Sequence, residues 1–277
     1  MSEKTIGIIA GAGQFPLLLA RAAKARGLRV VAVALKGETA PELEGLADET
    51  TWIRVGQLGK LVNALRQGGA QQAAMCGAVN KTRMFVDVVP DLKAWGLIRK
   101  MRHLADDGIL RTLAGVLEDE GITVMASHEL VPELLAPLGV LTKRGPSQEE
   151  SDDARFGWQV AAELGRLDIG QAVVVRHRVV VAVEAVEGTD ACIRRAGNLT
   201  RKGAVVIKRC KPGQDRRFDL PAVGAGTVES MVEAKAGCLV IEAGRTLVFD
   251  REQMVFDADQ AGLCVMALSD EQEQDGT

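Results

Sequence analysis

Three acidic side chains and a hydroxyl stand close together in the second half of the chain. The β-branched run Arg178–Ala185 is typical of a strand, and Glu184, Glu187, Thr189 and Asp190 gather at its end. Carboxylates beside a buried strand destabilise a fold unless a cation binds next to them. Hard Mg²⁺ and Mn²⁺ prefer oxygen ligands, often one or two carboxylates with waters and a substrate phosphate. The pattern therefore favours a divalent-metal site.

A strongly basic segment follows this acidic one. From Arg194 to Arg217 there are nine Lys or Arg residues and one acid, Asp215, so the local charge is +8 in a chain of net charge −3. Asp219 comes next, among the apolar residues of the string Phe218-Asp219-Leu220-Pro221. Carboxylates beside dense positive charge suit metal-assisted phosphoryl chemistry, because Arg and Lys neutralise phosphate oxygens. Two other interpretations stay open: a solvated basic face with Asp219 in a surface ion pair, and nucleic-acid contact.

A glycine-rich turn connects the first apolar run to the first amphipathic stretch. Gly11, Gly13 and Gln14 lie where a predicted strand passes into a predicted helix, and there backbone N–H groups and the helix dipole bind phosphate. The turn is not a complete dinucleotide fingerprint, because Pro16 replaces the third glycine. The next strand also ends at Lys36 without an acid to hold a ribose. A phosphate contact, an NAD(P) site and a plain tight turn remain the alternatives.

Composition and charge exclude several classes of protein. A net charge of −3, a pI near 5.8 and 3% aromatic residues argue against a nucleic-acid binder. No stretch reaches 18 consecutive apolar residues, and the N-terminus lacks a cationic segment with a cleavage site. Neither a membrane-spanning helix nor a secretory signal is therefore expected. The five cysteines form no C-x-x-C pair, which indicates a reduced cytosolic chain without structural zinc.

Apolar runs alternate with amphipathic stretches along the whole chain. In the first half this alternation predicts an α/β fold, a parallel sheet with helices on both faces; the second half is also α/β but richer in strands. Proline and glycine cluster between the halves, so we predict domains at 1–138 and 149–277, a linker at 139–148 and a disordered tail at 270–277. The predicted strands are Thr5–Ala10, Arg29–Leu35, Thr50–Val55, Ala73–Cys76, Ile122–Met125, Ala172–Arg176, Arg178–Ala185, Ala204–Cys210, Cys238–Glu242, Thr246–Asp250 and Leu263–Leu268. The predicted helices are Gln14–Arg26, Leu58–Gln67, Leu92–Leu104, Asp106–Glu120, Gln148–Leu164, Gly226–Ala236 and Arg251–Ala261.

Five strings of the chain occur in an order that is typical of one enzyme family. They are Ile8–Pro16, Gly56–Lys60, Asp168–Gln171, Glu184–Asp190 and Phe218–Gly224. The chain resembles the UDP-2,3-diacylglucosamine pyrophosphatases of the type found in bacteria that lack the metallophosphoesterase version. The resemblance covers nearly the whole length, and the stretch from Asp168 to Asp190 and the R-F-D-L-P string are its specific parts.

This resemblance implies a fold, a reaction and a set of site residues. The fold is a Rossmann-like N-terminal domain with a parallel sheet and a second, strand-richer α/β domain that is catalytic. The reaction is the hydrolysis of UDP-2,3-diacylglucosamine to 2,3-diacylglucosamine 1-phosphate (lipid X) and UMP in the lipid A biosynthesis of Gram-negative bacteria. It is expected to use Mg²⁺ or Mn²⁺ and to direct water to the β-phosphorus. The implied catalytic and metal-binding residues are Asp219 and Asp190, and the implied substrate contacts are Gly11, Gly13, Gln14, Gln171, Glu187, Gly188, Thr189, Lys211, Gln214 and Arg217.

The implied substrate also predicts partners and location. We expect a homodimer that binds no nucleic acid and attaches peripherally to the cytoplasmic face of the inner membrane. The apolar segment Val131–Leu141 is expected to line an acyl-chain site or to pack between the domains. Two other functions stay open: an NAD(P)-dependent oxidoreductase, and a non-enzymatic nucleotide- or lipid-binding protein.

Overall fold

The computed structural model describes residues 4–79, 106–218 and 220–270, and these form two compact units. The first unit comprises Met1–Pro132 together with Asp215–Asp219. The second unit comprises Glu133–Gln214 and Leu220–Thr277. The helix predicted at Leu92–Leu104 and nearly all of the tail predicted at 270–277 lie outside the described residues.

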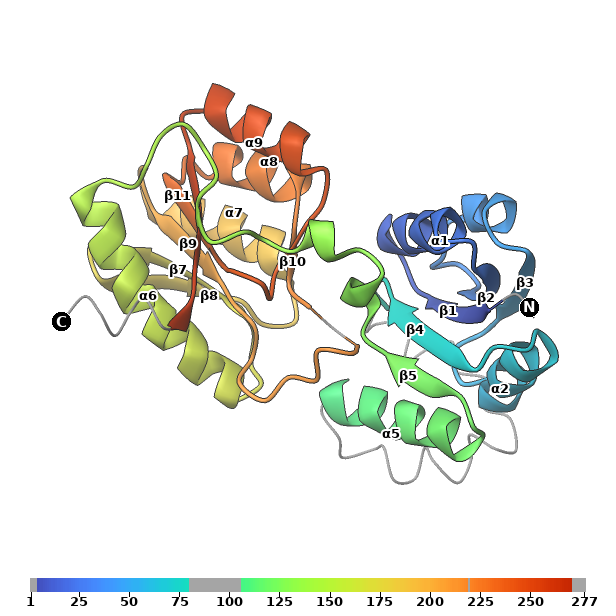
Figure 1. Cartoon of the computed structure of the whole chain (residues 1–277). Coiled ribbons are helices and arrows are strands. Elements are labelled where there is room, and N and C mark those ends of the chain that lie inside the picture. The colour runs from blue at the N-terminus through green and yellow to red at the C-terminus, as the bar shows by residue number, and fades with distance from the viewer. Residues whose placement is uncertain (1–3, 80–105, 219, 271–277) are drawn as a thin grey trace. The chain divides into compact units, whose positions relative to one another are not determined.

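The first unit is built around a five-stranded parallel sheet in the order β3-β2-β1-β4-β5 (Figure 1). Its central strands are short runs of branched and small apolar residues that are buried on both faces, as strands covered by helices must be. Helix α1 packs on one face through Phe15, Leu19 and Ala23, while α2 and α5 pack on the other. The elements are β1 (Thr5–Ala10), α1 (Phe15–Ala25), β2 (Arg29–Leu35), the 3-10 helix η1 (Pro41–Gly45), β3 (Glu49–Ile53), α2 (Leu58–Gln67), β4 (Gln72–Cys76), α5 (Asp106–Asp119), β5 (Thr123–Met125) and η2 (Ser127–Glu129).

The second unit contains a six-stranded mixed sheet in the order β6-β13-β11-β9-β7-β8. Strands β9, β11 and β13 are parallel to one another, and the remaining pairs are antiparallel. Helix α6 covers one face with the fully buried Trp158, and α7, α8 and α9 cover the other. The elements are η3 (Pro132–Leu134), β6 (Gly139–Val140), α6 (Gln148–Arg166), β7 (Ala172–Arg176), β8 (Val179–Val183), α7 (Thr189–Leu199), β9 (Val205–Lys208), β10 (Ala222–Val223), α8 (Ala225–Glu233), β11 (Cys238–Glu242), β12 (Leu247–Val248), α9 (Arg251–Gln260) and β13 (Cys264–Leu268).

The predicted fold class is confirmed in both halves of the chain. The N-terminal half forms a parallel sheet between helices, and the C-terminal half is an α/β unit with more strands. The ranges predicted for β1, β2, α2, β7 and β11 coincide with those of the structure. These elements were predictable because each is a continuous apolar run or a clear one-sided helix bounded by polar or glycine residues.

The structure places the segment predicted as a linker, 139–148, within the second unit. Gly139 and Val140 form β6 at the edge of the sheet, and Ser147 caps α6 in a capping box with Glu150. The chain also returns to the first unit once: Asp215–Asp219 belongs to it, and Phe218 is buried in its apolar core. The segment predicted as a linker therefore forms an edge strand and a helix cap.

The apolar segment Val131–Leu141 is partly packed and partly exposed. Val131 is buried, and Leu141 packs against the core of the second unit. Leu138 and Val140, by contrast, are 54% and 50% exposed. Within the described ranges, no helix is both long enough and apolar enough to cross a membrane.

The strands predicted on either side of His177 form an antiparallel hairpin, and a buried carboxylate holds its turn. His177 and Arg178 have φ of +54° and +58°, which matches the twist of the antiparallel strands β7 and β8. Asp153 of α6 is 1% exposed and accepts the amides of His177 (2.9 Å) and Arg178 (2.6 Å). Asp153 thus accepts hydrogen bonds from two backbone N–H groups. They belong to a turn whose positive φ angles are unfavourable for residues other than glycine.

Replacing Asp153 with alanine is expected to lower the free energy of unfolding by about 2 kcal/mol, because two backbone donors lose their acceptor. Urea denaturation followed by circular dichroism measures this change. Asp152 provides the matched control, since it is the adjacent carboxylate and its hydrogen bonds come from the side chains of Gln148, Arg155 and Arg178 at the surface. An equal loss for Asp152→Ala would contradict a specific role of Asp153 in the turn.

Candidate functional site

The glycine turn after β1 packs against the end of β4. The amide of Gly11 donates to the carbonyl of Cys76 (2.8 Å), and Ala12 and Ala78 exchange two backbone hydrogen bonds (2.7 and 3.1 Å). A Cβ at Gly11 would lie 2.4 Å from the carbonyl oxygen of Ala78, and a Cβ at Gly77 would lie 2.6 Å from that of Ala12. Both glycines are therefore required by the close approach of two backbone segments. Gly77 was not predicted, although a glycine directly after a short buried strand was the available signal.

Gly13 differs from Gly11 in its surroundings. It has φ of +91°, and within the described residues nothing lies within 4 Å of the position that a Cβ would take. Gln14 is the N-cap of α1 and Pro16 stands in its first turn. The turn lies between β1 and β4, where the strand order reverses and open α/β sheets bind ligands. The backbone N–H groups at the start of α1 are thus suited to an anion such as a phosphate.

In the second unit, the carboxylate of Glu184 is held by protein donors. Glu184 is 7% exposed and accepts hydrogen bonds from Thr189 Oγ1 (2.8 Å) and from the amide of Gln171 (3.3 Å). Gly170 approaches the same residue so closely that a Cβ would lie 2.1 Å from the carbonyl oxygen of Glu184. The position of this carboxylate is therefore explained without a bound cation. Glu184 joins the residues before β7 to the first residue of α7.

Glu187 has a guanidinium partner. Its carboxylate accepts hydrogen bonds from Arg195 Nη2 (2.6 Å) and from the amide of Ala185 (3.1 Å). The hydrogen bond from Arg195 is the main reason that the pKa of Glu187 lies below its ordinary value. Arg195 also donates to the carbonyl of Val183 (2.7 Å), so this member of the basic segment is hydrogen-bonded to the last residue of β8.

Helix α7 explains why acidic residues gather at this point. It begins at Thr189, directly after Gly188 with φ of +84°, and Asp190 lies in its first turn. Acidic side chains are favourable near the positive end of a helix dipole. This helix was not predicted, because the same residues also resemble a cluster of metal ligands. The signal that was available is the helical spacing of the buried residues Cys192, Ile193 and Ala196.

Most of the basic segment is paired within the fold. Lys208 and Arg209 are each only 7% exposed, and Lys208 Nζ donates to the carbonyl of Ala222 (2.8 Å). The segment is therefore neither a uniformly solvated face nor a block of cations open to phosphate. Its ion pairs within the described residues are Arg194–Glu233, Arg195–Glu187, Arg209–Glu242, Arg209–Asp270, Lys211–Asp168, Arg217–Asp215 and Arg217–Glu118.

The residues predicted to contact phosphate from the basic segment fall into different units. Lys211 and Gln214 belong to the second unit, where the amide of Lys211 donates to Gln214 Oε1 (3.0 Å). Arg217 belongs to the first unit, and its hydrogen bonds are the main cause of a lowered pKa of Asp215. Asp219 lies outside the described residues. In the sequence it stands where the chain crosses from the first unit back to the second.

Different elements of the two units position the predicted site residues. Gly11, Gly13 and Gln14 meet at the start of α1, and Lys211 and Gln214 follow β9. The remaining group surrounds the start of α7 and comprises Gln171, Glu187, Gly188, Thr189 and Asp190.

The chemistry of the donor set decides whether a divalent cation suits this chain. Within the described residues, no group of three or more His, Cys, Asp or Glu is arranged to hold a metal ion. Asp190 is exposed in the first turn of α7. Mg²⁺ keeps several waters and needs only one or two protein carboxylates. Asp190 and Asp219 therefore fit such an ion in ligand type, and the site stays a prediction.

Comparison with known proteins identifies the family. Residues 5–134 match the LpxI N-terminal domain, and residues 137–266 match the LpxI C-terminal domain. The chain belongs to the LpxI family. The membership inferred from the five sequence strings is confirmed, and the two matched segments adjoin near the point where the units of the structure divide.

A relative of this LpxI chain is the UDP-2,3-diacylglucosamine pyrophosphatase LpxI of Caulobacter vibrioides (strain ATCC 19089 / CIP 103742 / CB 15). It is 35% identical over 276 residues, which cover 96% of this chain and 98% of the relative.

Solved structures show weaker likeness. The biotin carboxylase domain of a single-chain bacterial carboxylase is 13% identical with a TM-score of 0.29, over 61% of this chain and 35% of that chain. Kluyveromyces lactis urea carboxylase is 22% identical with a TM-score of 0.23, over 27% of this chain and 7% of that chain. At such scores these likenesses support no conclusion about fold or function.

Proposed function

We propose that this LpxI chain hydrolyses the pyrophosphate bond of UDP-2,3-diacylglucosamine to UMP and 2,3-diacylglucosamine 1-phosphate, a step of lipid A biosynthesis. The observation that carries the proposal is 35% identity over 96% of the chain with a UDP-2,3-diacylglucosamine pyrophosphatase. Both family domains are matched, and 98% of the relative is covered. The chain is thus an enzyme of the hydrolase class.

Hydrolysis of a pyrophosphate requires mainly positioning and charge stabilisation from the protein. In the first unit, N–H groups beside Gly13 and Gln14 are suited to a phosphate oxygen of the substrate. In the second unit, the first turn of α7, which begins at Thr189 directly after Gly188, offers N–H groups of the same kind. We assign the substrate contacts to these two helix starts and to the Lys211–Gln214 loop after β9.

We further propose that Asp219 and Asp190 hold Mg²⁺ or Mn²⁺, with Asp219 also able to activate the attacking water. A bound divalent ion polarises a phosphoryl oxygen and so stabilises the charge that develops there. Titration with Mn²⁺, followed by electron paramagnetic resonance without substrate, tests the ligands independently of turnover. Asp190→Asn and Asp219→Asn are each expected to weaken Mn²⁺ binding. Unchanged affinity in both variants would remove these residues from the metal site.

Peripheral attachment to the cytoplasmic face of the inner membrane, as a homodimer, completes the proposal. The two acyl chains of the substrate favour a membrane-associated enzyme, and Leu138 and Val140 supply exposed apolar side chains in the second unit. Sedimentation with vesicles that contain the substrate tests attachment. Light scattering during size-exclusion chromatography tests the dimer, and a monomer mass at all concentrations would contradict it.

The reaction itself is tested by following UMP release from UDP-2,3-diacylglucosamine with Mg²⁺ and with EDTA. We expect release with Mg²⁺, loss of release with EDTA, and recovery when Mg²⁺ is returned. Hydrolysis in ¹⁸O-water locates the attack, because label is expected in 2,3-diacylglucosamine 1-phosphate if water reaches the β-phosphorus. Label in UMP would contradict that assignment. Binding of the substrate without turnover would instead favour a carrier protein.

A further inference from the structure

Residues 215–218 form a turn that belongs to the first unit, although Gln214 before it and Leu220 after it belong to the second. The turn directly precedes Asp219, to which the proposed function assigns the metal ion and the attacking water. Consecutive Cα atoms lie about 3.8 Å apart, so whatever fixes Phe218 also limits where the next residue can lie. The contacts of this turn therefore bear on the reaction.

Asp215 closes the turn through its backbone and its side chain. Its carbonyl accepts the amide of Phe218 (3.2 Å), and its Oδ1 accepts the amide of Arg217 (3.1 Å). The same carboxylate accepts a bidentate pair from Arg217, with Nε donating to Oδ1 (3.0 Å) and Nη2 to Oδ2 (2.9 Å). Aspartate favours such side-chain-to-backbone bonds in turns, and a bidentate guanidinium adds fixed geometry. Asp215 thus holds both the backbone and the side chain of Arg217.

Three contacts attach this turn to the rest of the first unit. Phe218 is 8% exposed and packs in the apolar core that also contains residues of α2 and α5. Arg217 Nη1 donates to Glu118 Oε1 near the end of α5 (2.8 Å), and His128 of η2 forms a hydrogen bond with the backbone of Arg216. The buried ring contributes most to the attachment, because the Arg217–Glu118 pair is partly exposed.

The guanidinium of Arg217 is used within the fold. Each of its three nitrogens donates to a carboxylate, Nε and Nη2 to Asp215 and Nη1 to Glu118. Its carbon also lies 4.8 Å from the ring centre of Phe218, within the range of a cation–π contact. A guanidinium held in this way fixes the backbone that carries it. Asp215 is the residue on which the arrangement depends, since it bonds to the amide and the guanidinium of Arg217 at once.

We infer that Asp215 is a positioning residue for the proposed hydrolysis: it holds the turn, anchored in the first unit by Phe218, from which the chain passes to Asp219. The inference rests on the proposed function and on the role which that function gives to Asp219. It adds a residue that acts on the reaction only through another. Misplacing a reacting group by about 1 Å can lower a rate on the order of 100-fold, so such a role is measurable.

Steady-state kinetics of two substitutions at residue 215 tests the role. Asp215→Ala removes the acceptor of the Arg217 amide and guanidinium, whereas Asp215→Asn keeps an oxygen for the amide and serves as the rescue. We expect kcat for UMP release from UDP-2,3-diacylglucosamine to fall about tenfold in Asp215→Ala and to recover largely in Asp215→Asn. KM should stay within about twofold in both, because the contacts that bind the substrate are retained.

Asp48→Ala is the matched control. Asp48 also lies in the first unit, and it accepts the amide of Val30 (2.8 Å) and Lys24 Nζ on both oxygens (2.8 and 2.9 Å). Its substitution removes the same kinds of bond in a segment that does not lead to Asp219. We expect a lowered melting temperature in both alanine variants and an unchanged kcat in Asp48→Ala. An equal fall of kcat in Asp48→Ala would overturn the inference, since lost stability alone would then explain it.

A double-mutant cycle with Asp219→Ala separates positioning from a general effect. If Asp215 acts through Asp219, Asp215→Ala lowers the kcat of wild type but leaves the residual kcat of Asp219→Ala unchanged. A fall by the same factor in both backgrounds would overturn the inference.

Hydrogen–deuterium exchange of the peptide that contains residues 215–218 follows the turn without turnover. We expect its amides to exchange about tenfold faster in Asp215→Ala and in Phe218→Ala, because the bonds and packing that protect them are lost. Phe218→Leu keeps an apolar anchor and should stay close to wild type. Circular dichroism verifies that each variant is folded, and unchanged exchange in Asp215→Ala would overturn the inference.

The two proposals fail in distinguishable ways. Absence of hydrolysis by wild type would overturn the proposed function and the positioning role together. Hydrolysis by wild type, with an unchanged kcat in a folded Asp215→Ala variant whose turn exchanges faster, would leave the proposed function intact and overturn the positioning role alone.

Discussion

Replacing Asp219 with alanine is expected to lower the rate of UMP release from UDP-2,3-diacylglucosamine by at least about 100-fold. The reason is charge: a carboxylate that holds a divalent ion or orients water stabilises the transition state, and alanine offers neither function. Asp219→Asn keeps the size of the side chain and removes its charge, so it is expected to lose activity to a similar degree. The loss should appear in kcat and not only in KM, because the interaction is made with the reacting phosphoryl group.

The control for this experiment is a carboxylate of the same type outside the proposed site. Asp119 is exposed at the end of α5, and Asp119→Ala is expected to retain full activity. Thermal melting is needed for every variant, since Phe218 and Leu220 on either side of Asp219 are both buried. Wild-type kcat in a folded Asp219→Ala variant would leave the reaction in place and discard Asp219 as its catalytic residue.

Local patterns in the sequence were sufficient to predict most of the elements of the fold. β1, β2, β7 and β11 are continuous apolar runs, and such runs form buried strands whichever neighbours they have. The short strands β6 and β10 have two residues each and were not predicted, whereas β12, also of two residues, lies within the predicted strand Thr246–Asp250. Their pairing depends on distant segments, and two residues carry no period. The order of strands in each sheet is likewise a property of tertiary packing that no local window contains.

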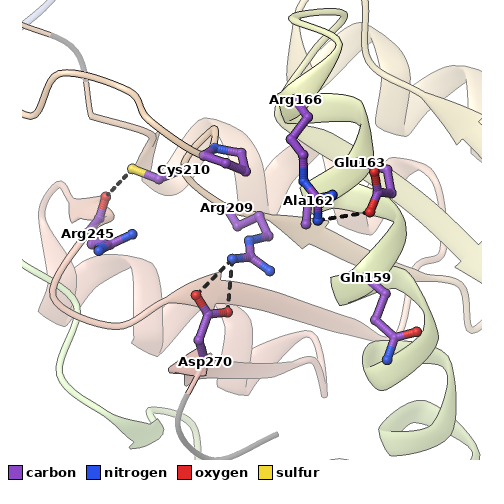
Figure 2. Close-up of a pocket in the computed structure, with 9 residues that line it drawn as sticks. Gln159, Ala162, Glu163, Arg166, Arg209, Cys210, Arg245 and Asp270 are labelled. Atoms are coloured by element: carbon purple, nitrogen blue, oxygen red, sulfur yellow. Dashed lines mark hydrogen bonds and ion pairs between the residues drawn. The ribbon is translucent and has the colours of Figure 1, made fainter.

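The candidate site was less predictable than the fold, for the same physical reason. The acidic residues before α7 resemble a metal site in the sequence, yet Arg195 and Thr189 already satisfy Glu187 and Glu184 in the structure. A charge count along the chain does not show which charges are paired across it. The pocket beside Arg209 (Figure 2) is lined by residues of α6 and of the segments that follow β9, β11 and β13, from Gln159 to Asp270 in the sequence. Only the folded sheet brings them together.

The glycine turn of the first unit provides the second prediction of large effect. Gly11→Ala is expected to lower the free energy of unfolding by about 3 kcal/mol, because the new Cβ would meet the backbone of Ala78 at 2.4 Å. Backbone atoms cannot turn aside as a flexible side chain does, so the turn or β4 must move. Gly77→Ala makes the reciprocal contact with Ala12 and is expected to destabilise to a similar extent. Urea denaturation measures both changes.

Gly13→Ala separates the structural role of the turn from its proposed contact with substrate. The open space beside Gly13 accepts a methyl group, and only the φ of +91° opposes the substitution, at about 1 kcal/mol. If the N–H groups at the start of α1 bind substrate phosphate, that methyl group stands in the path of the ligand. Gly13→Ala should then raise KM for UDP-2,3-diacylglucosamine severalfold in a protein that is still stably folded. An unchanged KM would show that the turn is glycine-rich for the packing of β1 against β4 alone, and the substrate contacts would have to lie elsewhere in the chain.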